Sequence, residues 1–206
     1  MYLSAKYAKR LQKLRQEKVN FDTSLKDTFT EENGWRLSDY EIDLPPEPPG
    51  PPLVRGSFAT AKQILYDYEF PDSALIEAVF DPDEPLHERT MLLIGKFAGM
   101  QFYFGGRVDG VIDELRRTED GPAQVWGYGY QTLESHWENG EITFEIWKYL
   151  DNGRVKFRFY SYVRIGYVPN QLYRVGFRMM WKWLQVQFAR TALARMRRLV
   201  VDRLKN

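Results

Sequence analysis

The segment YQTLESHWENGEITF, from Tyr130 to Phe144, joins two stretches that are rich in aromatic and β-branched residues. Its Asn139-Gly140 dipeptide is a turn signal, and such a dipeptide between two stretches of this kind predicts adjacent antiparallel strands. The segment also holds His136, one of only two histidines in the chain, with three glutamates within five positions of it. A strand, a turn and a second strand that carry these polar residues form the centre of the predicted fold.

The same alternation of apolar and polar residues extends on both sides of this segment. It is clearest from Val155 to Arg164, where Val, Phe and Ser positions alternate with Lys, Arg and Tyr, so one face of that strand is buried and the other is wet. We expect strands at residues 75–80, 88–98, 101–116, 123–133, 141–150 and 154–166. Turn signals such as Asp151-Asn152-Gly153 separate them. Connections this short imply an antiparallel meander of about six strands, and glycines inside the strands indicate bulges and strong curvature.

From Asn170 to Leu204 the apolar residues recur with the period of an α-helix, without an internal proline. At a rise of about 1.5 Å per residue this helix is about 52 Å long, which favours a bend. One apolar stripe consists of Phe177, Trp181, Leu184, Phe188 and Leu199, and a second, on nearly the opposite side, of Met179, Trp183, Val186, Leu193 and Val200. The sheet can cover one stripe. We expect the N-terminal helix with the proline-rich segment, a partner subunit or a membrane surface to cover the other.

The N-terminal part has a different pattern. Leucines and Tyr7 at helical spacing predict an amphipathic helix over residues 2–18, and six prolines in nine residues follow from Leu44 to Pro52. Such a segment is extended, and we expect it to strap the N-terminal helix onto the main domain, with an SH3-type ligand as the alternative. A short helix capped by Ser57 then opens the main domain. The expected division is therefore 1–43, an N-terminal helical extension; 44–55, a proline-rich strap; and 56–206, the ligand-binding-like domain.

Composition limits the possible function classes. The chain of 206 residues is 44% hydrophobic and 16% aromatic, which is typical of a folded globular protein. It has no cysteine, so disulfides, thiolate metal sites and cysteine nucleophiles are excluded. With no signal peptide and no apolar run of about 20 residues, we expect a soluble, cytoplasmic protein.

The net charge of +1 conceals an asymmetry between the two ends of the chain. Nine basic residues and one acid follow Pro169, which gives that segment +8 and leaves −7 for the rest. A nucleic-acid or anionic-lipid surface is one interpretation of the basic segment. We favour the other, in which it packs against the acidic remainder or is simply solvated, and we do not expect a nucleic-acid partner.

A short helix, a curved meander and a long terminal helix follow the order of the helix-grip architecture, an α+β class that includes START and birch-pollen-allergen-like domains. Residues 56 to about 200 resemble the domain-of-unknown-function family nineteen-ninety. The residues that match its motifs are Tyr130, Thr132, Leu133, His136, Glu138, Gly140, Glu141 and Phe144, together with Phe58, Ala61 and Ser161. Gln131 replaces a family glycine, Trp137 replaces a proline, and Val163 lies near another expected proline. The resemblance implies a START-like fold with pocket residues near the turn, and no established activity.

His136 and its neighbouring carboxylates allow two interpretations. His136 and Glu141 are candidate catalytic residues, since a histidine beside a carboxylate can transfer protons near neutral pH. In the favoured alternative, Glu138 and Glu141 accept backbone N–H groups that shape the loop, and His136 caps it. No second histidine lies at a helical or hairpin spacing, and no glycine-rich phosphate loop precedes a helix. We therefore expect no metal and no cofactor.

We expect a small apolar or aromatic ligand in a cavity between the sheet and the C-terminal helix. The predicted ligand-binding residues are Tyr130, His136, Phe144, Phe157, Phe159, Phe177, Trp181 and Leu184. One alternative is an enzyme that uses His136 and Glu141 in that pocket. The other is an interaction module, in which the basic, apolar C-terminal helix forms a homodimer or contacts a membrane surface. A cavity reached by His136 favours the enzyme, a cavity without it favours the binding module, and a filled core with an exposed second stripe favours the interaction module.

Overall fold

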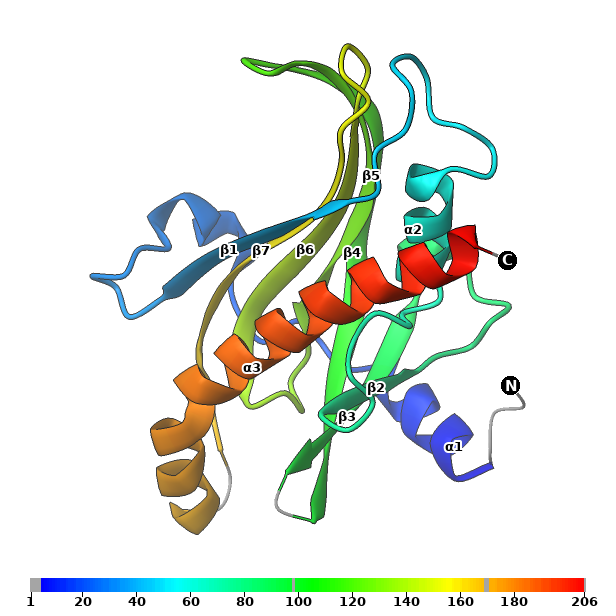
Figure 1. Cartoon of the computed structure of the whole chain (residues 1–206). Coiled ribbons are helices and arrows are strands. Elements are labelled where there is room, and N and C mark those ends of the chain that lie inside the picture. The colour runs from blue at the N-terminus through cyan, green and yellow to red at the C-terminus, as the bar shows by residue number, and fades with distance from the viewer. Residues whose placement is uncertain (1–4, 98, 169–170, 206) are drawn as a thin grey trace.

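The computed structural model describes residues 5–97, 99–168 and 171–205 (Figure 1). Within these residues, seven strands form one antiparallel sheet in the order β1-β7-β6-β5-β4-β3-β2. The strands are β1 Arg36–Leu44, β2 Ile76–Val79, β3 Thr90–Phe97, β4 Met100–Thr118, β5 Gly121–Thr132, β6 Glu138–Tyr149 and β7 Val155–Ile165. The α-helices are α1 Ala5–Leu14, α2 Ser57–Tyr66 and α3 Gln171–Leu204, and the 3-10 helices are η1 Thr23–Thr28 and η2 Leu86–Glu88. The predicted meander is confirmed, because β2 to β7 lie beside one another in sequence order.

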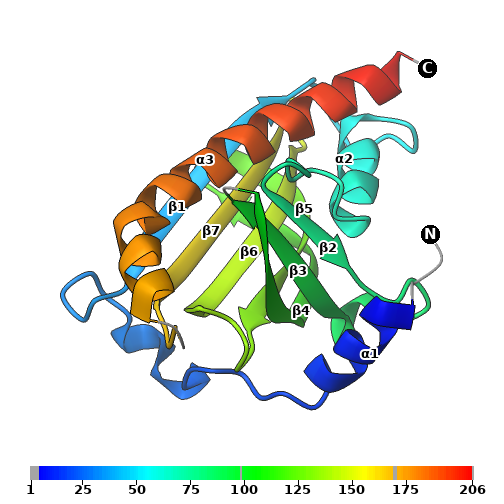
Figure 2. The same ribbon diagram turned by 90° about the horizontal axis from the view of Figure 1, so that it is seen from below.

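The sheet curls around α3, which crosses its concave face (Figures 1 and 2). Inward side chains of the central strands are aromatic and pack edge to face, as Phe144 does against Phe70 with ring centroids 4.9 Å apart. On α3, Ala189 and Ala192 are buried in the same core, and their small side chains let the helix approach the sheet closely. The first turns of α3 bend away from the rest of the helix (Figure 1). The predicted helix-grip fold is confirmed.

Strand β1 was not predicted from the sequence, which placed it in a helical extension. It pairs along its whole length with β7, with Tyr40 opposite Phe159. Its acidic positions alternate with its inward positions and meet basic residues of β7 and of the turn before it. Asp39 binds Arg158 of β7, and Asp43 binds Arg154, just before β7, at 2.7 Å. Opposite charges facing each other across two strands stabilise their pairing. The strand therefore depends on residues more than a hundred positions away, which no local pattern displays.

The proline-rich segment connects β1 to α2, and among the described residues its backbone bonds to β6 and to the turn that follows it. Its Glu47 is buried, and the carboxylate accepts the backbone N–H of Phe58 at 2.7 Å and that of Leu53 at 3.0 Å. The expected cap, Ser57, lies inside the helix and its hydroxyl has no hydrogen-bond partner among the described residues. Gly56 makes room for the carboxylate, since a Cβ there would lie 2.4 Å from its Oε1. The correction is that Glu47, and not Ser57, caps α2.

Helix α1 packs on the convex face of the sheet, away from α3. Its buried leucines, Leu11 and Leu14, form a cluster with Leu92 and Ile94 of β3. Arg107 of β4 donates from Nη2 to three backbone carbonyl groups at the end of this helix, each at 3.0 Å. The N-terminal helix therefore covers part of the convex surface of the sheet, and not the second stripe of α3, which was one of the expected arrangements.

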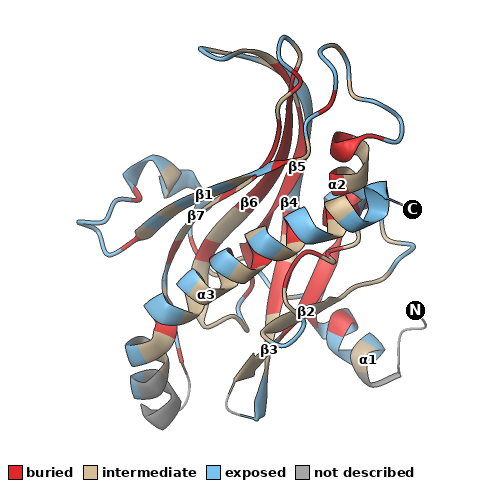
Figure 3. Ribbon diagram, viewed as in Figure 1, coloured by how far each residue is buried: buried red, intermediate tan, exposed pale blue. Residues whose placement is uncertain are grey.

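The second apolar stripe of α3 divides along its length. Val200 is fully buried and Leu193 packs against the core, whereas Met179 is 80% exposed and Trp183 is 51% exposed. Because α3 is bent and tilted, residues of this stripe reach the core only in the C-terminal half of the helix. The outward side of the rest is largely accessible (Figure 3). In the described part of the chain, no helix has the length and apolar character needed to cross a bilayer.

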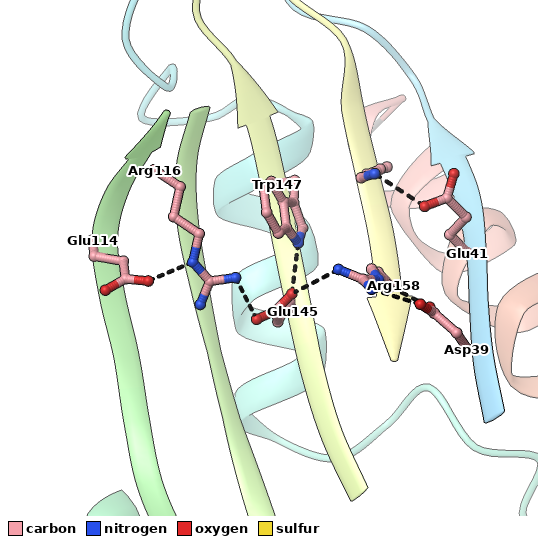
Figure 4. A network of polar contacts seen from close by, with 8 residues as sticks. Asp39, Glu41, Glu114, Arg116, Glu145, Trp147 and Arg158 are labelled. Atoms are coloured by element: carbon pink, nitrogen blue, oxygen red, sulfur yellow. Dashed lines mark hydrogen bonds and ion pairs between the residues drawn. The ribbon is translucent and has the colours of Figure 1, made fainter. Parts of the chain in front are cut away.

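Another part of the convex face carries an ion-pair network (Figure 4). Glu145 of β6 is fully buried and accepts Arg116 Nη1 at 2.7 Å and the indole N–H of Trp147 at 2.8 Å. Arg158 of β7 lies 3.9 Å from the same carboxylate and also binds Asp39 of β1. The network therefore links β4, β6, β7 and β1 across the curved surface.

Candidate ligand-binding cavity

A cavity of about 310 Å³ lies between the concave face of the sheet and the N-terminal half of α3. Its apolar wall is formed by side chains from α3 and from strands across the sheet, including both edge strands, β1 and β2. These include Tyr40, Ile76, Leu93, Phe104, Ile142, Phe159, Met180, Leu184 and Phe188. In the β3–β4 wall, Gly95 makes room for the ring of Phe104, since a Cβ there would lie 3.0 Å from that ring. The sheet and the bent helix therefore leave an apolar space between them.

His136 belongs to the polar part of the cavity wall. It lies in the connection between β5 and β6, where its Nδ1 accepts the backbone N–H of Glu138 at 2.9 Å. Its ring packs against Phe104, with ring centroids 4.9 Å apart. Burial lowers the pKa of His136 to about 4, so the imidazole is neutral near pH 7. Because Nδ1 is an acceptor, the proton of the neutral ring resides on Nε2.

Glu138 and Gln185 complete the polar part of the wall. The first residue of β6 is Glu138, and its Oε1 accepts the indole N–H of Trp181 and the amide N–H of Gln185, the latter at 3.1 Å. Burial raises the pKa of Glu138, and these two hydrogen bonds oppose that rise. The other amide atom of Gln185, Oε1, is buried and has no hydrogen-bond partner among the described residues. This polar end therefore holds a donor, a carboxyl group and a buried acceptor that has no partner among the described residues.

Five of the eight predicted ligand-binding residues line this cavity, namely Tyr130, His136, Phe159, Phe177 and Leu184. The other three are not part of the wall. Phe144 and Phe157 are fully buried in the aromatic core, and Trp181 is buried with its indole bound to Glu138. Ligand contact by any of these residues remains a prediction.

The candidate acid–base pair is not joined by a hydrogen bond in the described part of the chain. Glu141 is among the residues around the cavity, but its Oε2 accepts Lys26 Nζ at 2.7 Å and Gln131 Nε2 at 3.0 Å. Burial lowers the pKa of Lys26, but its hydrogen bonds, that to Glu141 foremost, raise the pKa overall. Glu141 is thus held by a charged partner, and the carboxylate connected to His136 through the backbone is Glu138.

Two residues of the polar wall were not predicted as site residues. Glu138 was assigned a role in shaping the loop, and Gln185 was not singled out. Gln185 lies four residues after Trp181, which places both on the same side of α3. A polar residue inside an apolar helical stripe is the signal that identifies it in the sequence. Among the described residues, no three His, Asp or Glu side chains gather closely enough to hold a metal ion.

Comparisons with known proteins add a family and several distant structures. The family described as Domain of unknown function (DUF1990) matches residues 24–195, a match that begins before β1 and not at residue 56. No curated protein matches the chain. The structure of Ara h 8.0201 has a TM-score of 0.48 at 10% identity and covers 84% of this chain and 100% of its own. A norcoclaurine synthase point mutant from Thalictrum flavum, in complex with a transition-state analogue, has a TM-score of 0.49 at 8% identity and covers 82% and 95%. A Staphylococcus aureus protein of unknown function has a TM-score of 0.44 at 9% identity and covers 84% and 98%.

Proposed function

The chain belongs to the family of Domain of unknown function (DUF1990), and we propose that it binds a small apolar or aromatic molecule in the cavity between the sheet and α3. The observation that carries this proposal is the cavity itself, about 310 Å³ with a wall made mainly of aromatic and aliphatic side chains. Cavities of roughly 300–1,000 Å³ with few polar groups are the usual form of a small-molecule site.

The physical driving force is the replacement of poorly bound water. A cavity of this volume has room for several water molecules. Most of its wall offers them no hydrogen bond, so an apolar molecule that displaces them removes apolar surface from water. Binding of this kind needs no reaction and no cofactor.

Ligand binding is favoured over proton transfer by His136 and Glu141. With a pKa of about 4, His136 has no proton to give as an acid near neutral pH. Glu141 is engaged by Lys26 and Gln131. The enzymatic alternative therefore needs a rearrangement of both side chains, whereas the binding module uses the cavity as it stands.

A filled-cavity variant tests the proposal. Leu184→Trp adds a large side chain to the wall, and we expect it to abolish the fluorescence increase of the neutral probe 1-aminoanthracene while the melting temperature stays the same or rises. Met179→Trp adds the same side chain on the exposed side of α3 and serves as the matched control. Equal probe binding by both variants would contradict the proposal, as would the absence of any bound molecule in native mass spectra of protein purified from several hosts.

The exposed side of α3 supports a second candidate function, contact with an anionic membrane surface. We define the outer face of α3 as Val175, Met179, Lys182, Trp183, Val186, Arg190 and Arg197, which share one side of the helix at 3.6 residues per turn. The four apolar residues are exposed, and the three basic residues are exposed as well. A face with tryptophan, aliphatic residues and cations but no acid is typical of helices that lie in the interface of an anionic bilayer.

Sedimentation with vesicles tests this candidate. We expect the protein to sediment with phosphatidylglycerol vesicles at low salt and to remain in solution with phosphatidylcholine vesicles. The double substitution Met179→Ser and Trp183→Ser should remove the binding, whereas exposed Leu115→Ser on β4 should not. If the protein forms a concentration-dependent dimer that the double substitution dissociates, the outer face is a contact between two copies and the membrane proposal is wrong.

A further inference from the structure

We propose that the cavity selects a neutral ligand whose apolar body ends in one hydroxyl group, held between His136 and Gln185. This inference rests on the proposed function and specifies the chemistry of its ligand. It follows from two hydrogen-bonding groups of the wall, Nε2–H of His136 and Oε1 of Gln185, for which the described residues show no partner. Both residues are hydrogen-bonded to Glu138. His136 accepts its backbone N–H, and Gln185 donates to its carboxylate, so the two belong to one polar end of the cavity.

The donor of this end is the imidazole of His136. Its Nδ1 is occupied by the N–H of Glu138 at 2.9 Å, and burial keeps the ring neutral near pH 7. The ring can therefore offer only Nε2–H to a ligand, and Nε2–H needs an acceptor. A hydrocarbon of the same shape would leave this donor without a partner.

The acceptor of this end is Oε1 of Gln185. The amide is oriented by Glu138, because its N–H group donates to that carboxylate at 3.1 Å. Oε1 is consequently directed elsewhere, and it is buried with no hydrogen-bond partner among the described residues. A buried acceptor without a partner is destabilising, and a ligand that donates a hydrogen bond to it would remove that cost.

A hydroxyl group meets both requirements, since it accepts one hydrogen bond and donates another. An ammonium group can donate to Gln185 but cannot accept from His136. A carboxylate can accept from His136 but would lie beside the carboxyl of Glu138 and could not donate to Gln185. The cation that lines the cavity, Lys96, is engaged by Glu77 at 2.7 Å and by the carbonyl group of Ser73 at 2.9 Å. It is therefore not free to neutralise a ligand's carboxylate.

Three probes that share a naphthalene ring test the selectivity by isothermal titration calorimetry. We expect 2-naphthol to bind about tenfold more tightly than 2-methylnaphthalene, which corresponds to about 1.4 kcal/mol. We also expect 2-naphthoate to bind more weakly than 2-naphthol. Equal affinity for the first two probes would overturn the inference and leave the proposed function standing. Failure of all three probes to bind would overturn both.

Substitution of each polar group separates its contribution. Gln185→Met and His136→Phe each keep a side chain of similar size, and each should reduce the preference for 2-naphthol severalfold while binding of 2-methylnaphthalene is retained. Retained binding of 2-methylnaphthalene shows that the variant is folded and that its cavity is open. If the full preference persists in both variants, the hydroxyl group is recognised elsewhere and the inference is wrong.

Discussion

At the scale of single residues, the chemistry of the cavity depends on how burial changes two titratable groups. Desolvation disfavours the charged form of each, so it lowers the pKa of His136 and raises that of Glu138. A histidine that is neutral near pH 7 is a hydrogen-bond donor of fixed direction and not a proton donor. If the cavity binds a ligand as proposed, His136 would contribute a neutral hydrogen-bond donor and not a charge.

The low pKa of His136 gives the first prediction. The ring resonances of His136 should not change as the pH falls through 6.5, and they should titrate only near pH 4. NMR spectra of the ring carbons and protons measure this, and His87→Gln leaves a single histidine and so assigns the signal. A midpoint near 6.5 would show that the ring is hydrated and would remove the argument for a fixed Nε2 proton.

The same shift has a consequence for stability, and its sign can be worked out. Between about pH 6.5 and 4 the unfolded chain binds a proton at His136 that the folded protein does not. The contribution of this group to the free energy of unfolding therefore falls as the pH falls through that window. Glu138 acts in the opposite direction, because its raised pKa lets the folded protein take up a proton before the unfolded chain does. NMR of the individual group separates the two effects, which a denaturation curve combines.

A second prediction concerns Glu145, the buried centre of the network in Figure 4. Glu145→Gln keeps the shape of the side chain but removes the charge that Arg116 and Arg158 share. Because the carboxylate is fully buried and the two guanidinium groups are only partly exposed, we expect a loss of about 2–3 kcal/mol in the free energy of unfolding. Urea denaturation measures it.

The control for this prediction lies in the same network. Glu114 also binds Arg116, but its side chain is 52% exposed, and an exposed ion pair contributes less than about 1 kcal/mol. Glu114→Gln should therefore change stability little. Equal effects of the two substitutions would mean that burial does not decide the strength of this network.

At the scale of secondary-structure elements, several boundaries are set by residues far away in the sequence. The helix α2 illustrates this, because the side chain that caps it comes from the proline-rich segment, eleven residues before Phe58, and not from the adjacent Ser57. The same segment is anchored to β6 by the hydrogen bond from Lys148 Nζ to the carbonyl group of Pro48 at 2.7 Å. Its extended, rigid form therefore positions a helix cap.

This assignment gives the third prediction. Glu47→Gln replaces an oxygen that accepts a backbone N–H with an amide group that donates, so one of the two N–H groups of Leu53 and Phe58 loses its acceptor. We expect a loss of about 1–3 kcal/mol in the free energy of unfolding. Ser57→Ala should change it by less than about 0.5 kcal/mol, since that hydroxyl has no partner among the described residues. The reverse order of the two effects in urea denaturation would restore Ser57 as the cap.

At the scale of the whole molecule, the parts of the fold that could be predicted are those with a local period. Strands β2 to β7 show apolar–polar alternation in their own sequence, and α3 shows the helical period. Their observed bounds therefore agree with the predicted ranges to within a few residues. Strand β1 could not be predicted, because its charged positions are explained only by the basic positions of β7. For the same reason α1 was associated with α3 and not with the convex face, since an amphipathic helix does not specify its partner.

The candidate site was predictable to a similar degree. Tyr130, Phe159 and Leu184 were found because inward positions of a strand and one stripe of a helix follow from periodicity. The distinction between wall and core could not be made in this way. Phe157 and Phe159 share one face of β7, yet only the second lines the cavity, because the bend of α3 decides where space remains.

The last prediction concerns helix α1, which packs on the convex face of the sheet. Helix α1 contributes few residues to the main core, and its attachment to the sheet depends on a small leucine cluster and on Arg107, whose guanidinium donates to three backbone carbonyl groups, those of Leu14, Arg15 and Glu17. These carbonyl groups lie at and just beyond the C-terminus of α1, where the carbonyl groups of a helix lack partners within it. That of Leu14 also accepts the backbone N–H of Glu17 at 3.1 Å. Arg107→Met should therefore increase amide hydrogen exchange in residues 5–14 while the exchange of β5 and β6 stays unchanged, because a peripheral element can open without global unfolding.

Lys13→Met is the matched control, since it also removes one positive charge but from an exposed position on α1. It should leave exchange in α1 close to that of the unmodified protein. If Arg107→Met instead increases exchange across the whole sheet, α1 and the sheet unfold as one cooperative unit. Helix α1 would then be part of the core that keeps the cavity in shape, and removal of the helix would alter any ligand binding on the opposite face of the sheet.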